Sequence, residues 1–99
     1  MSMNELVLKY VMRPQRMFTP AANVADAMSV LLELDSRGWF WSMHRNDDHG
    51  RRYYIELFRL VGEEYECHTG FGDSMTHVIC EAAVKACGAT DDEVRDADQ

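Results

Sequence analysis

The segment from Tyr65 to Gly88 constrains the fold most, because it holds a short strand, a glycine turn and a complete helix in that order. Residues 65–69 alternate and predict a strand, and residues 70–73 (Gly-Phe-Gly-Asp) predict a turn. Ser74 is placed to cap a helix that Gly88 ends. The segment therefore predicts the closing β-to-α unit of a compact domain. The helix has one apolar face at i, i+3 and i+4 spacing: Met75, Val78, Ile79, Ala82, Ala83 and Ala86.

Two further helices are predicted in the first part of the chain. Ser2 and Glu5 form a capping-box pattern, and the apolar spacing that follows predicts a first helix over residues 3–12. A second helix is predicted to begin between Thr19 and Asn23 and to end at residues 36–38, which read Ser-Arg-Gly.

Three strands are predicted between the second helix and the last. Residues 39–45 are rich in aromatic side chains and too short for another helix. Residues 53–60 and 64–69 predict the second and third strands, with turns at 46–50 and 61–63. The element order is α-α-β-β-β-α. The predicted fold class is therefore α+β, a three-stranded antiparallel meander packed with helices as an α-β-α sandwich.

A chain of 99 residues predicts one domain, and its composition changes near the end. After Gly88, residues 89–99 contain five acidic residues and one arginine. We therefore expect a single compact domain at 1–88 and an acidic, flexible tail at 89–99. Such a tail would be removable with little loss of stability, because it supplies almost no apolar surface.

The second strand carries apolar side chains on both faces. Tyr53, Ile55 and Leu57 point one way. The opposite face carries Tyr54, Phe58 and Leu60, with only Glu56 as a polar interruption. Something must therefore cover each face of the sheet. The two long helices can cover one face, and either the first helix or a second copy of the chain can cover the other, so we expect a homodimer.

The net charge of −7 argues against general binding to nucleic acid or to an anionic membrane. The sequence has no apolar run of about 18 residues and no basic-then-apolar secretory signal at its start. We expect a soluble, cytoplasmic protein with no membrane partner. Its three cysteines lack the spacing of a disulfide framework, and Cys80, one step from the apolar stripe of the last helix, is expected to be a buried or half-buried free thiol.

A family resemblance rests on four segments of the chain. They are residues 4–7 (Asn-Glu-Leu-Val) with Val11 and Met12, residues 23–30 before Gly38, the strands, and residues 79–86 (Ile-Cys-Glu-Ala-Ala-Val-Lys-Ala). Together these segments resemble the phage ABA sandwich domain family over roughly residues 4–88. The resemblance implies a small phage or prophage protein with an α-β-α layered fold and no established general activity. Arg13 and Pro14 stand where that family often has Gly-Trp, which leaves the path of residues 13–22 open.

No residue set predicts catalysis. The four histidines fall on different predicted elements, without a recognised catalytic or metal-ligand spacing. We therefore expect no enzymatic activity, no metal site and no cofactor. Gly70, Gly72 and Ser74, just before the last helix, could hold an anion on backbone N–H groups, although a tight turn that needs glycine is the favoured explanation.

The aromatic residues 39–41 are explained first by packing under the first helix. The alternative is an interaction surface around the first two strands, because Trp and Tyr side chains dominate binding hot spots. The arginines at the end of this hairpin form the only local basic cluster in the sequence. The predicted partner-binding residues are Trp39, Trp41, Arg45, Arg51, Arg52 and Tyr54.

Two functional hypotheses follow from these observations. The first is a non-catalytic phage accessory protein that binds a host protein stoichiometrically and inhibits a defence complex, in the manner of an anti-CRISPR protein. The alternative is an oligomeric binder, or sponge, of a small nucleotide signal held at the hairpin arginines or at the turn before the last helix.

Overall fold

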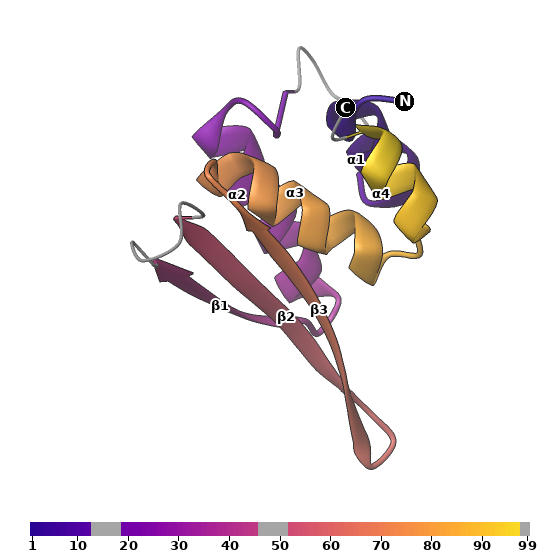
Figure 1. Cartoon of the computed structure of the whole chain (residues 1–99). Helices are drawn as coiled ribbons and strands as arrows, with labels where there is room; N and C mark the ends of the chain where they lie inside the picture. Colours follow the sequence, from indigo (N-terminus) through magenta and orange to yellow (C-terminus); the bar gives the residue numbers. More distant parts are fainter. Residues whose placement is uncertain (13–18, 46–51, 98–99) are drawn as a thin grey trace.

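The predicted order of helices and strands is present, with one helix added at the end of the chain. The computed structural model describes residues 1–12, 19–45 and 52–97 (Figure 1). The elements within these residues are α1 (Met3–Tyr10), α2 (Val24–Ser36), β1 (Phe40–Arg45), β2 (Tyr53–Val61), β3 (Glu64–Gly72), α3 (Met75–Ala86) and α4 (Asp91–Ala97).

The predicted starts of the first two helices are confirmed by their caps. Ser2 Oγ accepts a hydrogen bond of 3.2 Å from the Glu5 N–H, and the Glu5 carboxylate accepts one of 3.0 Å from the Ser2 N–H. Asn23 Oδ1 accepts from the Asp26 N–H at 3.1 Å and so caps α2. Asp26 in turn accepts from the Thr19 N–H at 2.9 Å, which fixes the entry to this helix.

The strands form an antiparallel meander in the order β1-β2-β3, as the sequence predicted. Ile55 in the central strand pairs with Met43 in β1 and with Gly70 in β3. The second and third strands are joined by a two-residue turn in which Gly62 has a φ of 64°, a conformation that favours glycine. The turn predicted at 46–50 lies outside the described residues.

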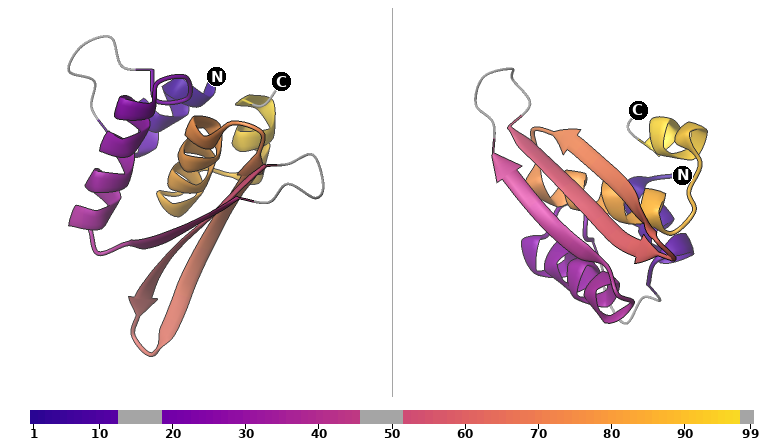
Figure 2. Two further views of the ribbon diagram at one scale, coloured as in Figure 1. Left: turned by 90° about the vertical axis from the view of Figure 1, so that its left-hand side faces the viewer. Right: turned by 90° about the horizontal axis from the view of Figure 1, so that it is seen from below.

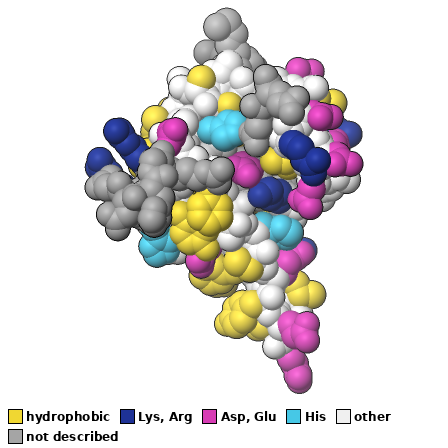
Figure 3. Space-filling model, in the orientation of Figure 1, with side chains coloured by type: hydrophobic (Ala, Val, Ile, Leu, Met, Phe, Trp, Pro, Cys, Tyr) yellow, Lys and Arg dark blue, Asp and Glu magenta, His cyan; other side chains and the backbone are white. Residues whose placement is uncertain are grey.

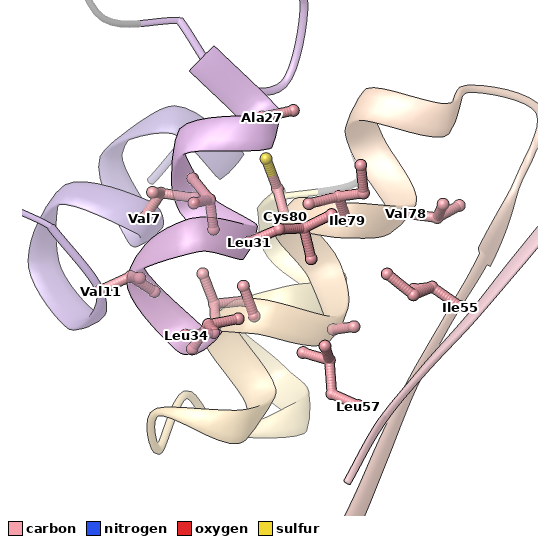
Figure 4. Packing of buried hydrophobic residues seen from close by; sticks show 14 of the residues in the cluster. Val7, Val11, Ala27, Leu31, Leu34, Ile55, Leu57, Val78, Ile79 and Cys80 are labelled. Atoms are coloured by element: carbon pink, nitrogen blue, oxygen red, sulfur yellow. The ribbon is translucent and has the colours of Figure 1, made fainter. Parts of the chain in front are cut away.

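Helix α3 lies at the centre of the molecule, between the sheet and the other helices (Figure 4). Val78 points toward Ile55 and Leu57 of the sheet, and Cys80 lies on the opposite side, toward α1 and α2 (Figure 4). Burial therefore extends beyond the single apolar face that the sequence predicted, because a helix between two layers loses contact with water on both sides. The buried residues of α3 are Thr76, Val78, Ile79, Cys80, Ala82, Ala83 and Val84.

The described helices all lie on one face of the sheet (Figure 2). The α+β class and the meander are confirmed, but the layering differs from the expected sandwich, in which helices would cover both faces. Helix α1 packs against α3 and α4 and not against the strands. The buried side chains of α1, which are Met3, Leu6 and Val7, pack within the layer of helices. None of them covers the second face of the sheet.

The third strand continues to Gly72, three residues beyond the predicted end, so the glycines expected in a turn are paired strand residues. Gly70 faces α3, and a Cβ atom added there would overlap the Val78 carbonyl group of that helix. A residue without a side chain thus allows helix and strand to approach closely.

The prediction of a flexible acidic tail at 89–99 is wrong for most of that segment, because residues 91–97 form helix α4. Val94 is 4% exposed and packs into the main core. Thr90 and Glu93 exchange hydrogen bonds of 3.1 and 3.2 Å between backbone N–H and side-chain oxygen, which is the pattern of a capping box. This Thr-x-x-Glu signal was present in the sequence, but the density of acidic residues around it concealed it.

Candidate interaction surface

The face of the sheet that no described helix covers is the candidate site, and we call it the open face (Figure 2, right). The strand register assigns its members, since directly paired residues point to the same side. They are Phe40, Ser42 and His44 of β1, Tyr54, Glu56, Phe58 and Leu60 of β2, and Tyr65, Cys67, Thr69 and Phe71 of β3.

An aromatic row crosses the open face near the start of β2. Tyr54 pairs with His44 on one side and with Phe71 on the other. The Tyr54 ring centroid lies 5.7 Å from that of His44, in a stacked arrangement, and 4.5 Å from that of Phe71. His44 is held in turn by a 2.9 Å hydrogen bond between its Nε2 and Ser42 Oγ. These contacts fix the orientation of the central Tyr54 ring.

A second aromatic row lies four residues further along β2. The Phe58 ring stacks on Phe40 of β1 with centroids 5.7 Å apart and meets Tyr65 of β3 edge-on at 6.3 Å. Phe40 and Tyr65 remain 60% and 70% exposed. More than half of the surface of these two side chains therefore faces solvent. Monomeric proteins seldom leave such a contiguous apolar surface uncovered without a functional reason.

A polar row separates the two aromatic rows. Glu56 is its centre, and Ser42 and Thr69 are its direct neighbours on the flanking strands. The Tyr54 hydroxyl donates a short hydrogen bond to Glu56 Oε1. This hydrogen bond, with burial as a smaller cause, raises the pKa of Tyr54 to about 12, so the phenol stays protonated at neutral pH. The open face therefore carries a carboxylate between two aromatic rows.

The β2–β3 hairpin extends the open face beyond the helices (Figure 1). Leu60 and Val61 near its tip are both more than half exposed, although they point to opposite faces. Hydrophobic side chains gather over the sheet and acidic ones lie at the hairpin tip (Figure 3). Glu63 and Glu64 supply exposed carboxylates there.

The predicted partner-binding residues lie in different parts of the structure. Trp39 is 2% exposed and belongs to the core, so its prediction as a contact residue is corrected. Its ring meets His68 edge-on at 5.8 Å and is covered by the Arg59 guanidinium at 4.6 Å, and both of these residues belong to the helix-facing side of the sheet. Trp39 immediately precedes β1, and strand alternation places its side chain on the same helix-facing side as Trp41 and Met43.

Among the predicted contact residues that the structure describes, Tyr54 is the one that lies on the open face. Trp41 is 42% exposed, but its register with Leu57 places it on the helix-facing side, at the edge of the sheet. Arg45 and Arg52 are exposed near the start of β2. Arg51 lies outside the described residues.

The predicted anion-binding turn is also corrected. Gly70 and Gly72 are strand residues beside Val78, and neither forms an open loop before the helix. Ser74 is the N-cap of α3, where its Oγ accepts from the His77 N–H at 3.3 Å. Its hydroxyl also lies 2.9 Å from Thr76 Oγ1. The two glycines therefore serve the packing of β3 against α3, and Ser74 serves capping.

Of the aromatic side chains on the open face, only Tyr54 was among the predicted contact residues. Phe58, Tyr65 and Phe71 became significant only when the register placed them beside Phe40 and Tyr54. The available signal was the alternation of apolar residues in the second and third strands. That alternation shows which residues of one strand share a face, but not which residues of the next strand join them.

Other chemistry has less support in the described part of the chain. No group of three or more His, Cys, Asp or Glu side chains there is placed to hold a metal ion. Within residues 1–12, 19–45 and 52–97, no helix is long and apolar enough to cross a bilayer. Comparison of the chain with protein-family models, with curated proteins and with solved structures gives no match.

Proposed function

We propose that this protein acts without catalysis, by stoichiometric binding of a partner protein through the open face. The observation that carries the proposal is the exposed aromatic surface on a sheet whose other face packs against the helices. Aromatic side chains on a rigid sheet supply large contact areas at a low cost in conformational entropy. Phe40, Phe58, Tyr65 and Phe71 are held by ring contacts within this surface and are therefore already ordered for binding.

The biological setting is part of the proposal and rests on the sequence resemblance. We propose a small phage or prophage accessory protein that acts in the bacterial host cytoplasm and inhibits a host defence complex. Inhibition by occupancy requires a shaped surface and no reactive group. Titration of a purified target would then saturate near a fixed molar ratio. Inhibition by far less than stoichiometric protein, growing with time, would mean catalysis and would contradict the proposal.

The nucleotide-sponge alternative has less support. The turn that would have held the phosphate is a paired strand with Gly70 against Val78. Of the hairpin arginines that the structure describes, Arg45 points to the helix side of the sheet and Arg52 precedes the first residue of β2. Self-association remains a second candidate for covering the open face, since the aromatic rows could pack against those of another copy.

A matched pair of variants tests the role of the open face. Phe40 on β1 is 60% exposed and Leu32 on α2 is 66% exposed, so replacing either by serine should change stability little. The tagged wild type and both variants would be used to capture a partner from a host lysate, and the affinity for the purified partner would then be measured. Phe40→Ser should weaken binding by roughly 30-fold, the effect of losing a hot-spot residue. Leu32→Ser should bind like wild type, and equal binding by all three proteins would contradict the role of the open face.

A further inference from the structure

The position of Glu56 defines what the open face can accept. It is the only Asp or Glu among the described residues of this face, and it lies in the middle of the central strand. Alternate residues of a strand are about 7 Å apart, so Tyr54 and Phe58 stand about this distance on either side of the carboxylate. Both rings are held by neighbours, Tyr54 by Phe71 and Phe58 by Phe40.

Binding of a purely apolar partner over Glu56 would be energetically unfavourable. Covering the open face removes Glu56 from water, and an ionised carboxylate without a charged partner costs several kcal/mol to bury. The Tyr54 hydroxyl compensates only in part, because it donates one hydrogen bond and a carboxylate can accept about four. The occupant must therefore bring hydrogen-bond donors, and preferably a positive charge, to the centre of an otherwise apolar contact.

A guanidinium group meets both requirements of the site. It is planar, so it can lie against an aromatic ring, and its donor fork can bind a carboxylate with two hydrogen bonds. A lysine ammonium supplies the charge but cannot stack in this way. The net charge of −7 also favours the approach of a basic surface over an acidic one.

A second copy of the chain satisfies these requirements poorly. The members of the open face, all of them among the described residues, include no arginine or lysine, so two such faces packed together would bring in a second Glu56 carboxylate and no arginine or lysine to pair with it. Arg45 points to the helix side of β1, and Arg52 precedes the first residue of β2. Face-to-face pairing would therefore bury two like charges in an apolar interface.

We propose that the occupant of the open face is a partner protein segment that places an arginine side chain over Glu56, between Tyr54 and Phe58, with apolar residues on both sides of the arginine. This inference rests on the proposed function and specifies the chemistry of the partner. The aromatic rows bind the apolar flanks, and the polar row of Ser42, Glu56 and Thr69 binds the guanidinium group.

The test uses the full chain and a pair of defined peptides. Backbone amide NMR spectra would be recorded while acetyl-Leu-Arg-Leu-amide is added up to about 10 mM, a range that detects binding worth only about 3–4 kcal/mol. The matched peptide carries citrulline, which has the shape of arginine without its charge. The arginine peptide should shift amides of β1, β2 and β3 that surround Glu56, and it should bind about tenfold more tightly than the citrulline peptide, as expected for a charge-assisted hydrogen bond.

Two variants assign the effect to Glu56. Glu56→Gln keeps an acceptor for the Tyr54 hydroxyl but removes the charge, and it should abolish the preference for arginine. Glu64→Gln removes the same charge at the exposed hairpin tip and should leave the preference intact. Equal losses in both variants would indicate general attraction to an acidic protein. Equal binding of both peptides, or no shift at the highest concentration, would overturn the inference.

The remaining outcomes separate the two proposals. If the open-face amides shift when the protein alone is diluted, a second copy is the occupant and the arginine inference is wrong. If the peptide experiment fails but Phe40→Ser still weakens partner binding and Leu32→Ser does not, the proposed function survives and only the chemistry of the partner is wrong. If neither serine variant affects the partner, the proposed function itself fails.

Discussion

The hydroxyl of Tyr10 lies 2.6 Å from Oε1 of Glu93 and ties the last helix to the first across the whole length of the chain. The Lys9 ammonium adds an ion pair of 3.1 Å to the other oxygen of the same carboxylate. Thr90 donates to it as well, from its backbone N–H at 3.1 Å. Helix α4 is therefore held both by polar contacts at its start and by the apolar contact of Val94.

Removal of α4 should destabilise the protein, in contrast to the effect expected for a flexible tail. Val94→Ala isolates the apolar part of this contact and should lower the free energy of unfolding by about 1.5 kcal/mol, because it removes two buried carbon atoms. Asp92→Ala, at an exposed site on the same helix, is the matched control and should change it by less than about 0.5 kcal/mol. Urea denaturation measures both values, and equal effects would show that α4 is not docked.

The contribution of Glu93 should depend on pH. The Tyr10 hydroxyl first, and then Thr90 and Lys9, hold the pKa of this carboxyl at about 2, below its ordinary value of 4.5. A group with a lowered pKa stabilises the fold above its unfolded-state pKa and loses that contribution as the pH falls toward its folded-state pKa. Glu93→Gln should therefore lower the melting temperature most at neutral pH. The deficit relative to wild type should shrink from pH 4.5 down to about 2, and a deficit independent of pH would contradict this assignment.

Gly70→Ala should destabilise the protein much more than Gly72→Ala. A Cβ atom at position 70 would overlap the Val78 carbonyl group, which belongs to the backbone of α3 and cannot move without shifting the helix. At position 72 the added atom would meet only the Val78 side chain, at 3.2 Å. Overpacking typically costs about 1–3 kcal/mol, and the substitution at position 70 should reach or exceed the upper end. Denaturant unfolding of the two variants compares them, and similar costs would exclude the close approach of β3 and α3.

Two tryptophans separated by one residue should behave differently on substitution. Trp39→Ala removes a buried ring and should lower the free energy of unfolding by about 3–5 kcal/mol. Trp41→Ala removes a ring that is 42% exposed and should cost considerably less. Loss of partner binding in the Trp39 variant would therefore reflect unfolding, and circular dichroism of both variants would reveal it. A Trp39 variant as stable as wild type would place this ring outside the core.

The three thiols should react with an aromatic disulfide reagent at three different rates. Cys67 is exposed on the open face and should react first. Burial raises the pKa of Cys87, which is only partly accessible, so this thiol should react more slowly. Burial raises the pKa of Cys80 to about 12, and this thiol should react only after denaturant is added. Absorbance at about pH 8 follows the reaction, and a single rate for all three in folded protein would contradict the packing of α3.

Local patterns in the sequence predicted the secondary structure because the interactions that define it are local. The caps at Ser2 and Asn23 are contacts between residues three apart, and the pleat of residues 53–60 follows from a period of two. The same kind of signal at Thr90 and Glu93 predicts α4, once the acidic residues around it are not taken as evidence of disorder. Cys80 was expected to be buried or half-buried, and the structure confirms a buried free thiol.

The sequence by itself determined which segments are helices and strands and which residues of one strand share a face. The tertiary structure decided that all described helices cover the same side of the sheet, that Trp39 is buried while Phe40 is exposed, and that Gly70 faces a helix. These outcomes depend on contacts between residues far apart in the chain, above all on the register between strands and on α1 packing against α3. No local period specifies such contacts, so the open face with Glu56 at its centre emerges only when the three strands are paired.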